Sequence, residues 1–267
     1  MNGRNWGVDD VKQCKKYKDL RIKGSVLLKY CGEGGDLVVP ADVTEIESGA
    51  FTRCRGLTSV VLPEGLVKIG DYSFRSCTCL KKIVLPNTLR EIKKGAFRNC
   101  SALTEAVLPK GLTLLDREAF HGCVSLTHMT LPPSLLEICP DAFHGCSGLT
   151  SLTFSEGLTN IGWNAFQYCE GLTRIALPEG LRKIGCTAFW DCYNLTNITL
   201  PKSLEEIGPR AFSHGKKVGA DSFTYKNPTI YAPAGSYAEY YATLYRFGFQ
   251  AMAEEQYPTL GVCREDI

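Results

Sequence analysis

Eight phenylalanines divide the chain into units of 23 residues, with no insertion or deletion between them. They are Phe51, Phe74, Phe97, Phe120, Phe143, Phe166, Phe189 and Phe212. Each of the first seven is followed three residues later by a cysteine, from Cys54 to Cys192, and three residues further on by a leucine, from Leu57 to Leu195. A fixed period of this length predicts a stack of similar structural units. One unit cannot bury its own apolar face, so the core forms only between stacked neighbours.

The unit from Leu177 to Thr199 carries the repeat nearly intact, as LPEGLRKIGCTAFWDCYNLTNIT. Its leucines, its isoleucines and its Ala-Phe-x-x-Cys segment resemble the BspA-like leucine-rich repeats, which are known mainly from surface proteins of gut and oral bacteria. The resemblance covers roughly residues 37–247, including the ending from Ile230 to Ala238. It implies an α/β solenoid, a right-handed superhelix of short strands and short helical or 3₁₀ turns with terminal caps. It also implies ligand binding or adhesion without catalysis, and it identifies no ligand.

Within a unit, the segment Leu57–Leu62 has the alternation of a short strand, with Val60 and Leu62 pointing inward and the residues between them outward. Pro63 then ends the strand, because proline has no amide hydrogen to donate to a sheet. The small residue before each phenylalanine, such as Ala96, favours a turn of α- or 3₁₀-helix that carries the chain back to the next strand.

We expect three parts along the chain: an N-terminal arm and cap over residues 1–36, a solenoid of about eight units over residues 37–227, and a C-terminal cap helix and tail over residues 228–267. Near the N-terminus, the segments Ser25–Cys31 and Asp36–Pro40 flank a glycine-rich turn, which predicts a hairpin. Extending the period backwards places Leu28 in the phenylalanine column and Cys31 in the cysteine column. We therefore interpret this cap as an eroded repeat.

At the other end, Ser236 and Glu239 have the spacing of a helix capping box. Apolar residues follow at helical spacing and predict the buried face of a closing helix; they are Tyr240, Tyr241, Leu244 and Phe247. Gly248 is the expected stop of this helix. The segment from Lys216 to Asn227 interrupts the last unit and is interpreted as a loop.

Thirteen cysteines raise the question of a metal site or of disulfides. Eight of them, from Cys31 to Cys192, fall in one column, and a column offers ligands along a line instead of around one ion. Neighbours in the column lie close enough for a disulfide, but an odd total in a buried column favours free thiols. We expect a ladder of buried, reduced thiols, with no metal and no cofactor.

His121 and His144 lie 23 residues apart, so they stack on neighbouring units. Two imidazoles about 5 Å apart are able to share a metal ion. We favour the simpler interpretation, in which both rings are exposed and continue the column of Arg75 and Arg98. That column then forms a cationic stripe whose charge increases at acidic pH.

Composition excludes several classes of protein. The net charge is only +2, and no segment has the roughly 18 consecutive apolar residues that span a membrane. Charged residues interrupt the first 30 positions, which therefore lack the apolar stretch of a signal peptide. As written, the chain is not expected to be exported, which leaves a cytoplasmic location open, whereas the family resemblance implies a secreted or cell-surface protein. A fragment of a longer surface protein would have this same sequence, so localisation is left open.

The sequence contains no nucleophile elbow, P-loop or dinucleotide-binding glycine motif. We expect a non-enzymatic protein that binds another macromolecule, in protein–protein interaction or adhesion. The alternative is an intracellular scaffold of the same fold, favoured by the missing leader and the free thiols. A third class, an accessory enzyme acting on carbohydrate or peptide, finds no acid–base pair here. The expected partner is a protein, with no nucleic acid and no membrane insertion.

Two surfaces are candidates for binding. The first, the strand face, combines the variable column Lys82, Glu105, His128 and Arg174 with an uncharged ridge that includes Val84, Val107 and Thr130. The second, the aromatic patch, contains Trp163, Tyr168, Trp190 and Tyr193 on the turns of two adjacent units. Such aromatic residues are enriched at binding hot spots. Each surface also has a plain structural explanation, since every sheet has an outward side and the aromatic residues are equally suited to packing beneath the C-terminal cap.

Overall fold

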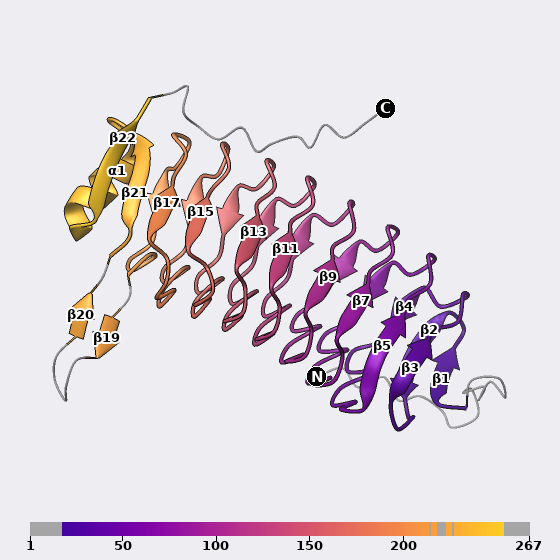
Figure 1. Cartoon of the computed structure of the whole chain (residues 1–267). Coiled ribbons are helices and arrows are strands. Elements are labelled where there is room, and N and C mark those ends of the chain that lie inside the picture. The colour runs from indigo at the N-terminus through magenta and orange to yellow at the C-terminus, as the bar shows by residue number, and fades with distance from the viewer. Residues whose placement is uncertain (1–17, 214, 218–222, 226, 254–267) are drawn as a thin grey trace, which may run out of the picture.

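The computed structural model describes residues 18–213, 215–217, 223–225 and 227–253. The chain forms a β-solenoid of about nine turns of parallel strands with little helix. Figure 1 shows the coils side by side, from β1 at the N-terminal end to β22 and α1 at the C-terminal end. The strands line two faces of the coil, and each coil contributes one strand to either face.

The strand face carries the longer strands. They are β3 (Gly35–Val38), β5 (Leu57–Val61), β7 (Lys82–Val84), β9 (Glu105–Val107), β11 (His128–Thr130), β13 (Ser151–Thr153), β15 (Arg174–Ala176), β17 (Asn197–Thr199), β21 (Thr229–Pro233) and β22 (Gly248–Met252). Their hydrogen-bond ladder is continuous from β3 to β9, from β11 to β13 and from β15 to β22. The ladder is therefore interrupted between β9 and β11 and between β13 and β15.

In the repeat units, the second face consists of two-residue strands. They are β4 (Glu45–Ile46), β6 (Lys68–Ile69), β8 (Glu91–Ile92), β10 (Leu114–Leu115), β12 (Glu137–Ile138), β14 (Asn160–Ile161), β16 (Lys183–Ile184) and β18 (Glu206–Ile207). Each isoleucine or leucine at the second position is buried. Within the repeat units of both faces, paired residues are 23 positions apart, as in Lys82 with Glu105 on the strand face and Glu137 with Asn160 on the second face.

The phenylalanine column forms the centre of the core. All eight rings are fully buried, and successive ring centroids are between 4.6 and 5.5 Å apart with interplanar angles of 20° or less. Burying one such ring contributes about 1.5–3 kcal/mol, and each ring pair adds about 0.5–1.5 kcal/mol. The predicted column is confirmed.

The cysteine column lies beside these rings and forms a hydrogen-bonded ladder. From Cys77 to Cys192, six buried thiols each donate to the carbonyl oxygen of the phenylalanine one coil earlier, at 3.0–3.3 Å. Burial raises the pKa of these thiols, to about 12 for Cys100, Cys146 and Cys192. Cys54 is half-buried, and Cys31 is exposed. The expectation that Cys31 belongs to the buried column is therefore wrong.

The turns around each phenylalanine contain no helix, which corrects the expected helical or 3₁₀ turns and makes the fold a β-solenoid instead of an α/β solenoid. Amides alternate between two kinds of acceptor. The amide of Phe97 donates to Ala119 of the next coil, whereas the amide of Arg98 donates three residues back to Gly95. Asn99 then takes a left-handed backbone, with φ 59°. A 3₁₀-helix needs consecutive amides that each bond to the carbonyl three residues back. Here every second amide bonds to the next coil instead, so no 3₁₀-helix forms.

The N-terminal cap differs from the predicted hairpin. β1 (Leu20–Lys23) and β2 (Val26–Tyr30) form an antiparallel hairpin, and β2 pairs with β4 on the second face. β3 instead pairs with β5 on the strand face. The glycine-rich segment between β2 and β3 therefore carries the chain from one face to the other. Tyr30 packs on Phe51 at 5.5 Å, so it holds the column position that the period assigned to Leu28.

The C-terminal cap is helix α1 (Tyr237–Tyr245), which lies between β21 and β22 in the chain. The capping box forms in part: Ser236 is the N-cap and its hydroxyl accepts a bond from the Glu239 amide at 3.4 Å, whereas the Glu239 carboxylate accepts one from the Gly235 amide, one residue before the N-cap, at 2.6 Å. The helix ends at Arg246, which has φ 58°, and not at the predicted Gly248, which begins β22.

The buried side of α1 is narrower than the sequence pattern predicted. Ala238, Tyr241 and Ala242 are buried, and Tyr241 packs edge-on against Phe212 at 6.1 Å. Phe247 is also buried, just after the helix. Tyr240 and Leu244, expected in the same apolar face, are instead 60% and 56% exposed.

The segment predicted as a loop contains an antiparallel hairpin. Its strands are β19 (Gly215–Lys217) and β20 (Phe223–Tyr225), with Lys217 opposite Phe223. The remainder of that segment, apart from Asn227, lies outside the described residues. Within the described part of the chain, no helix is long and apolar enough to cross a membrane.

Candidate functional site

The strand face brings the predicted site residues into two parallel rows. In the three-residue strands of this face the middle side chain points into the core and the outer two point outward, as in β7 and β9. Lys82 and Val84 therefore stand beside Glu105 and Val107 on the paired neighbouring strand. His128 and Thr130 occupy the same positions on β11, and Arg174 continues the charged row on β15.

The uncharged row is longer than predicted at its N-terminal end. Val38, Val61, Val84 and Val107 lie in register on four adjacent strands and are between 54% and 61% exposed. β-Branched side chains favour strands, but they bury apolar area only when something covers them. The sequence analysis missed Val38 because its strand follows an irregular glycine-rich segment. The spacing of 23 residues from Val61 was the available signal.

Charges on this face are partly paired with one another. The Lys82 Nζ and Glu105 Oε2 atoms are 3.0 Å apart, and His128 Nδ1 lies 2.7 Å from the Thr127 hydroxyl. Further towards the N-terminus, the Asp36 carboxylate accepts bonds from Ser59 and Thr58, which lower the pKa of that carboxyl. The face therefore carries both acidic and basic side chains along the row and no extended patch of one charge.

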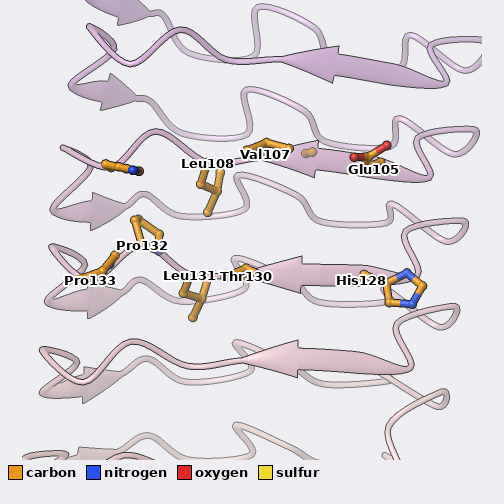
Figure 2. Close-up of a pocket in the computed structure, with 10 residues that line it drawn as sticks. Glu105, Val107, Leu108, His128, Thr130, Leu131, Pro132 and Pro133 are labelled. Atoms are coloured by element: carbon orange, nitrogen blue, oxygen red, sulfur yellow. The ribbon is translucent and has the colours of Figure 1, made fainter. Parts of the chain in front are cut away.

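A groove of about 350 Å³ opens between β9 and β11, where the ladder is interrupted. Figure 2 shows Glu105 and His128 at one end of it and the two consecutive prolines at the other. The lining residues are Glu105, Ala106, Val107, Leu108, Lys110, His128, Thr130, Leu131, Pro132 and Pro133. Four predicted site residues, Glu105, Val107, His128 and Thr130, thus share one depression. Lys82 and Val84 lie on the strand beside β9, and Arg174 lies away from the groove on β15.

The chemistry of the groove suits recognition. Its middle is apolar, and hydrogen-bonding or charged groups stand at both ends, which is a common arrangement of ligand-binding sites. Among the described residues, no three His, Cys, Asp or Glu side chains converge in a way that could hold a metal ion.

The aromatic patch is only partly brought together. Tyr168 and Trp190 have ring centroids 6.2 Å apart. Burial and the nearby Asp191 raise the pKa of Tyr193 to about 12, and that tyrosine remains 40% exposed. Trp163 is 48% exposed and, within the described part of the chain, makes no ring contact with the other three.

The two histidines stack on neighbouring units, as the 23-residue spacing predicted, and the second of them makes an unpredicted contact with Tyr168. The rings of His121 and His144 are stacked at 4.5 Å with an interplanar angle of 2°, and Tyr168 meets His144 edge-on at 5.4 Å. Both histidines are half-buried, so the expected exposed stripe is wrong. Burial, followed by the nearby Arg98 and His144, lowers the pKa of His121 to about 4. Nitrogen lone pairs lie in the ring planes, and parallel planes do not converge on one metal ion.

The residue pattern and the fold can now be set beside known proteins. A family described as BspA type leucine rich repeat region, in six copies, matches residues 24–149 and 114–234. The chain belongs to the BspA-type leucine-rich repeat family. The resemblance inferred from the repeat is therefore confirmed.

Solved bacterial structures share the fold of this BspA-type chain. A leucine-rich repeat protein of T. pallidum is 28% identical, with a TM-score of 0.51, over 68% of this chain and 77% of its own. A leucine-rich cell surface protein of Faecalibacterium prausnitzii is 24% identical, with a TM-score of 0.50, over 70% of this chain and 69% of its own. A Eubacterium ventriosum leucine-rich repeat protein is 24% identical, with a TM-score of 0.58, over 64% of this chain and 46% of its own. No curated protein matches significantly.

Proposed function

We propose that this BspA-type repeat protein is a non-enzymatic binding protein that holds a protein partner on its strand face. The observation that carries the proposal is the register of the exposed side chains. Val84, Val107 and Thr130 form one row, and Lys82, Glu105, His128 and Arg174 form a second row along the same face.

The core supports this role because it fixes the backbone beneath both rows. The middle residue of each strand is buried in the core, which fixes the backbone that carries the outward side chains. Binding a partner therefore costs little additional backbone entropy. None of the outward residues is needed for the core. Their identities are therefore free to encode a partner.

The groove between β9 and β11 supplies an anchor point within that face. Val107 and Pro133 are exposed and offer apolar area that a partner side chain could cover, and Glu105, His128 and Lys110 offer polar groups at the rim. Interfaces gain most of their affinity from a few such central contacts surrounded by polar residues.

We extend the proposal to adhesion at the cell surface. The Faecalibacterium prausnitzii protein of the same fold is described as a cell surface protein, and an elongated repeat face suits contact with a host or neighbouring cell. The alternative, an intracellular scaffold, would use the same face. Protease treatment of intact source cells separates the two: digestion of the protein supports the surface role, and full protection supports the scaffold.

The aromatic patch is a second candidate for the contact surface. The observation that favours it is the contact between Tyr168 and Trp190 with the exposed Tyr193 nearby. Aromatic residues bury large areas with few rotatable bonds.

Position-specific photo-crosslinking tests the proposal. A photoreactive amino acid is placed at Val107, at Trp190, or at Leu136, which is 51% exposed and adjoins the second face. We expect a partner to be crosslinked from Val107 and not from Leu136. Crosslinking from Trp190 alone would move the site to the aromatic patch, and crosslinking from neither would reject both surfaces.

A further inference from the structure

The outer side of the C-terminal cap carries large exposed apolar side chains beside the exposed Thr243, which is unusual for a surface helix. Tyr240 and Leu244 are 60% and 56% exposed, and Tyr237, on the same side of α1, is 37% exposed. Surface helices normally place polar residues away from the core. Contiguous exposed apolar residues of this kind mark interaction sites. The apolar residues that the sequence pattern assigned to one buried face therefore lie on two sides of the helix. Tyr241 packs on the solenoid, whereas Tyr240 and Leu244 are exposed.

Two charged residues stand at opposite ends of α1. Glu239 is in the first turn, and Arg246 is at the C-cap, just beyond the last helical residue. The Glu239 carboxylate accepts a bond from the Gly235 amide. Within the described part of the chain, Arg246 forms no ion pair.

The exposed side of α1 is complementary to the same side of a second copy of the helix. In an antiparallel pair of α1 helices centred on Ala242, Tyr240 of each copy lies opposite Leu244 of the other. Arg246 of each copy then lies one residue, about 1.5 Å along the axis, from Glu239 of the other. The two-fold axis makes both ends of the pair equivalent, so each end brings Arg246 of one copy near Glu239 of the other.

We infer that α1 is a self-association surface, through which two copies of this chain pair their C-terminal caps about a two-fold axis. A second copy satisfies all three features at once: the apolar pair Tyr240 and Leu244, the free cation of Arg246 and the acidic first turn. Few side chains are involved, and stable interfaces bury roughly 1,200–2,000 Å². The dimer therefore forms and dissociates with concentration.

Sedimentation equilibrium over a wide concentration range tests this inference. The wild-type chain is expected to shift from monomer to dimer as its concentration rises. Leu244→Asp should raise the dimer dissociation constant at least about tenfold, because the dimer would bury a carboxylate against Tyr240 of the second copy. Leu136→Asp is the matched control, since Leu136 is a similarly exposed leucine near the second face, at 51%, and it should leave the constant unchanged.

Arg246→Glu provides a test that leaves the helix core untouched. It should weaken the dimer several-fold at low salt and much less at high salt, because it places like charges together. Small-angle scattering of the dimer should give two solenoids joined at their ends. A chain that stays monomeric at every concentration would overturn the inference. So would a dimer that Leu244→Asp and Arg246→Glu leave unchanged while circular dichroism shows both variants folded.

Discussion

Each phenylalanine of the central column touches the ring of the coil before it and the ring of the coil after it. Phe143 lies 5.5 Å from Phe120 and 5.2 Å from Phe166. A cavity at this position would be lined by two neighbouring coils, and the backbone ladders on both faces limit how far those coils can close.

Truncation of this ring should be strongly destabilising. We expect Phe143→Ala to lower the free energy of unfolding by about 3–5 kcal/mol, whereas Thr130→Ala, on the exposed strand face, should change it by about 0.5 kcal/mol or less. Urea denaturation followed by circular dichroism measures both. A similar small change for the two variants would contradict the account of the column.

The cysteine ladder makes a prediction about reactivity. Thiolates are the reactive form, and burial both raises the thiol pKa and blocks access. In the native protein, iodoacetamide should modify the exposed Cys79 and Cys186 long before Cys100, Cys123 and Cys146. Mass spectrometry of peptides from the alkylated protein resolves each site. Equal modification of buried and exposed positions would show that the ladder is open to solvent.

The stacked histidines predict a loss of stability in acid. Burial lowers the pKa of both rings from 6.5, to about 4 for His121. The unfolded chain therefore binds more protons than the folded chain between these values, and stability falls as pH drops from about 6.5 towards 4. Asp141 acts against this effect at His144.

A double replacement with glutamine isolates that effect. Gln167 occupies the same column position in the next unit, so His121→Gln with His144→Gln copies a side chain that the fold already accepts. The urea midpoint of the variant should fall less than that of the wild type between pH 7 and pH 4. Identical pH profiles would mean that the histidines protonate freely in the folded state.

At the level of elements, α1 closes the stack through one large side chain. Tyr241 is 1% exposed and contacts the rings of Phe212, Tyr245 and Phe247. The neighbouring Tyr240 is 60% exposed. The two tyrosines are adjacent in sequence and differ only in the side of the helix that they occupy.

This pair gives a matched test of the cap. Tyr241→Ala should cost about 3–5 kcal/mol of stability, as expected for loss of a buried aromatic ring, whereas Tyr240→Ala in dilute solution should cost about 0.5 kcal/mol or less. Thermal melting at low protein concentration compares the variants. Equal losses would mean that the helix buries the wider face that the sequence pattern suggested.

The repeat was predictable from sequence because the same residue types occupy the same buried positions in every unit. Phe51 to Phe212, their cysteines and the outward strand residues all follow from the 23-residue period. The ends were less predictable because they lack that repetition. Tyr30 fills the column position assigned to Leu28, since the first coil is two residues shorter than the period. A hairpin and a crossing between faces have the same glycine-rich signature, which is why β3 was assigned the wrong partner.

Some features of the candidate site were also predictable from the repeat, and others were not. The period predicted which side chains of the strand face point outward. It did not predict the groove between β9 and β11, because the spacing between two strands depends on packing that no single unit encodes. The contact between His144 and Tyr168 also escaped, since Tyr168 reaches it from a left-handed backbone position with φ 60°.

At the scale of the whole molecule, the side chains that stabilise the solenoid and those that it exposes belong to different columns. Buried columns run along its length and determine stability between neighbouring coils. Exposed rows run beside them and are free to differ from coil to coil. The central claim is that the strand face, and not the aromatic patch, holds the protein partner.

The most direct measurement of this claim is the affinity of the crosslinked partner for two sets of folded variants. One set reverses charges on the strand face, with Lys82→Glu, Glu105→Lys and Arg174→Glu. The other removes rings from the aromatic patch, with Trp190→Ala and Tyr193→Ala. We expect the first set to weaken binding at least about tenfold, as loss of a few interfacial contacts does, and the second to leave binding unchanged. Full affinity in the first set with loss in the second would contradict the claim.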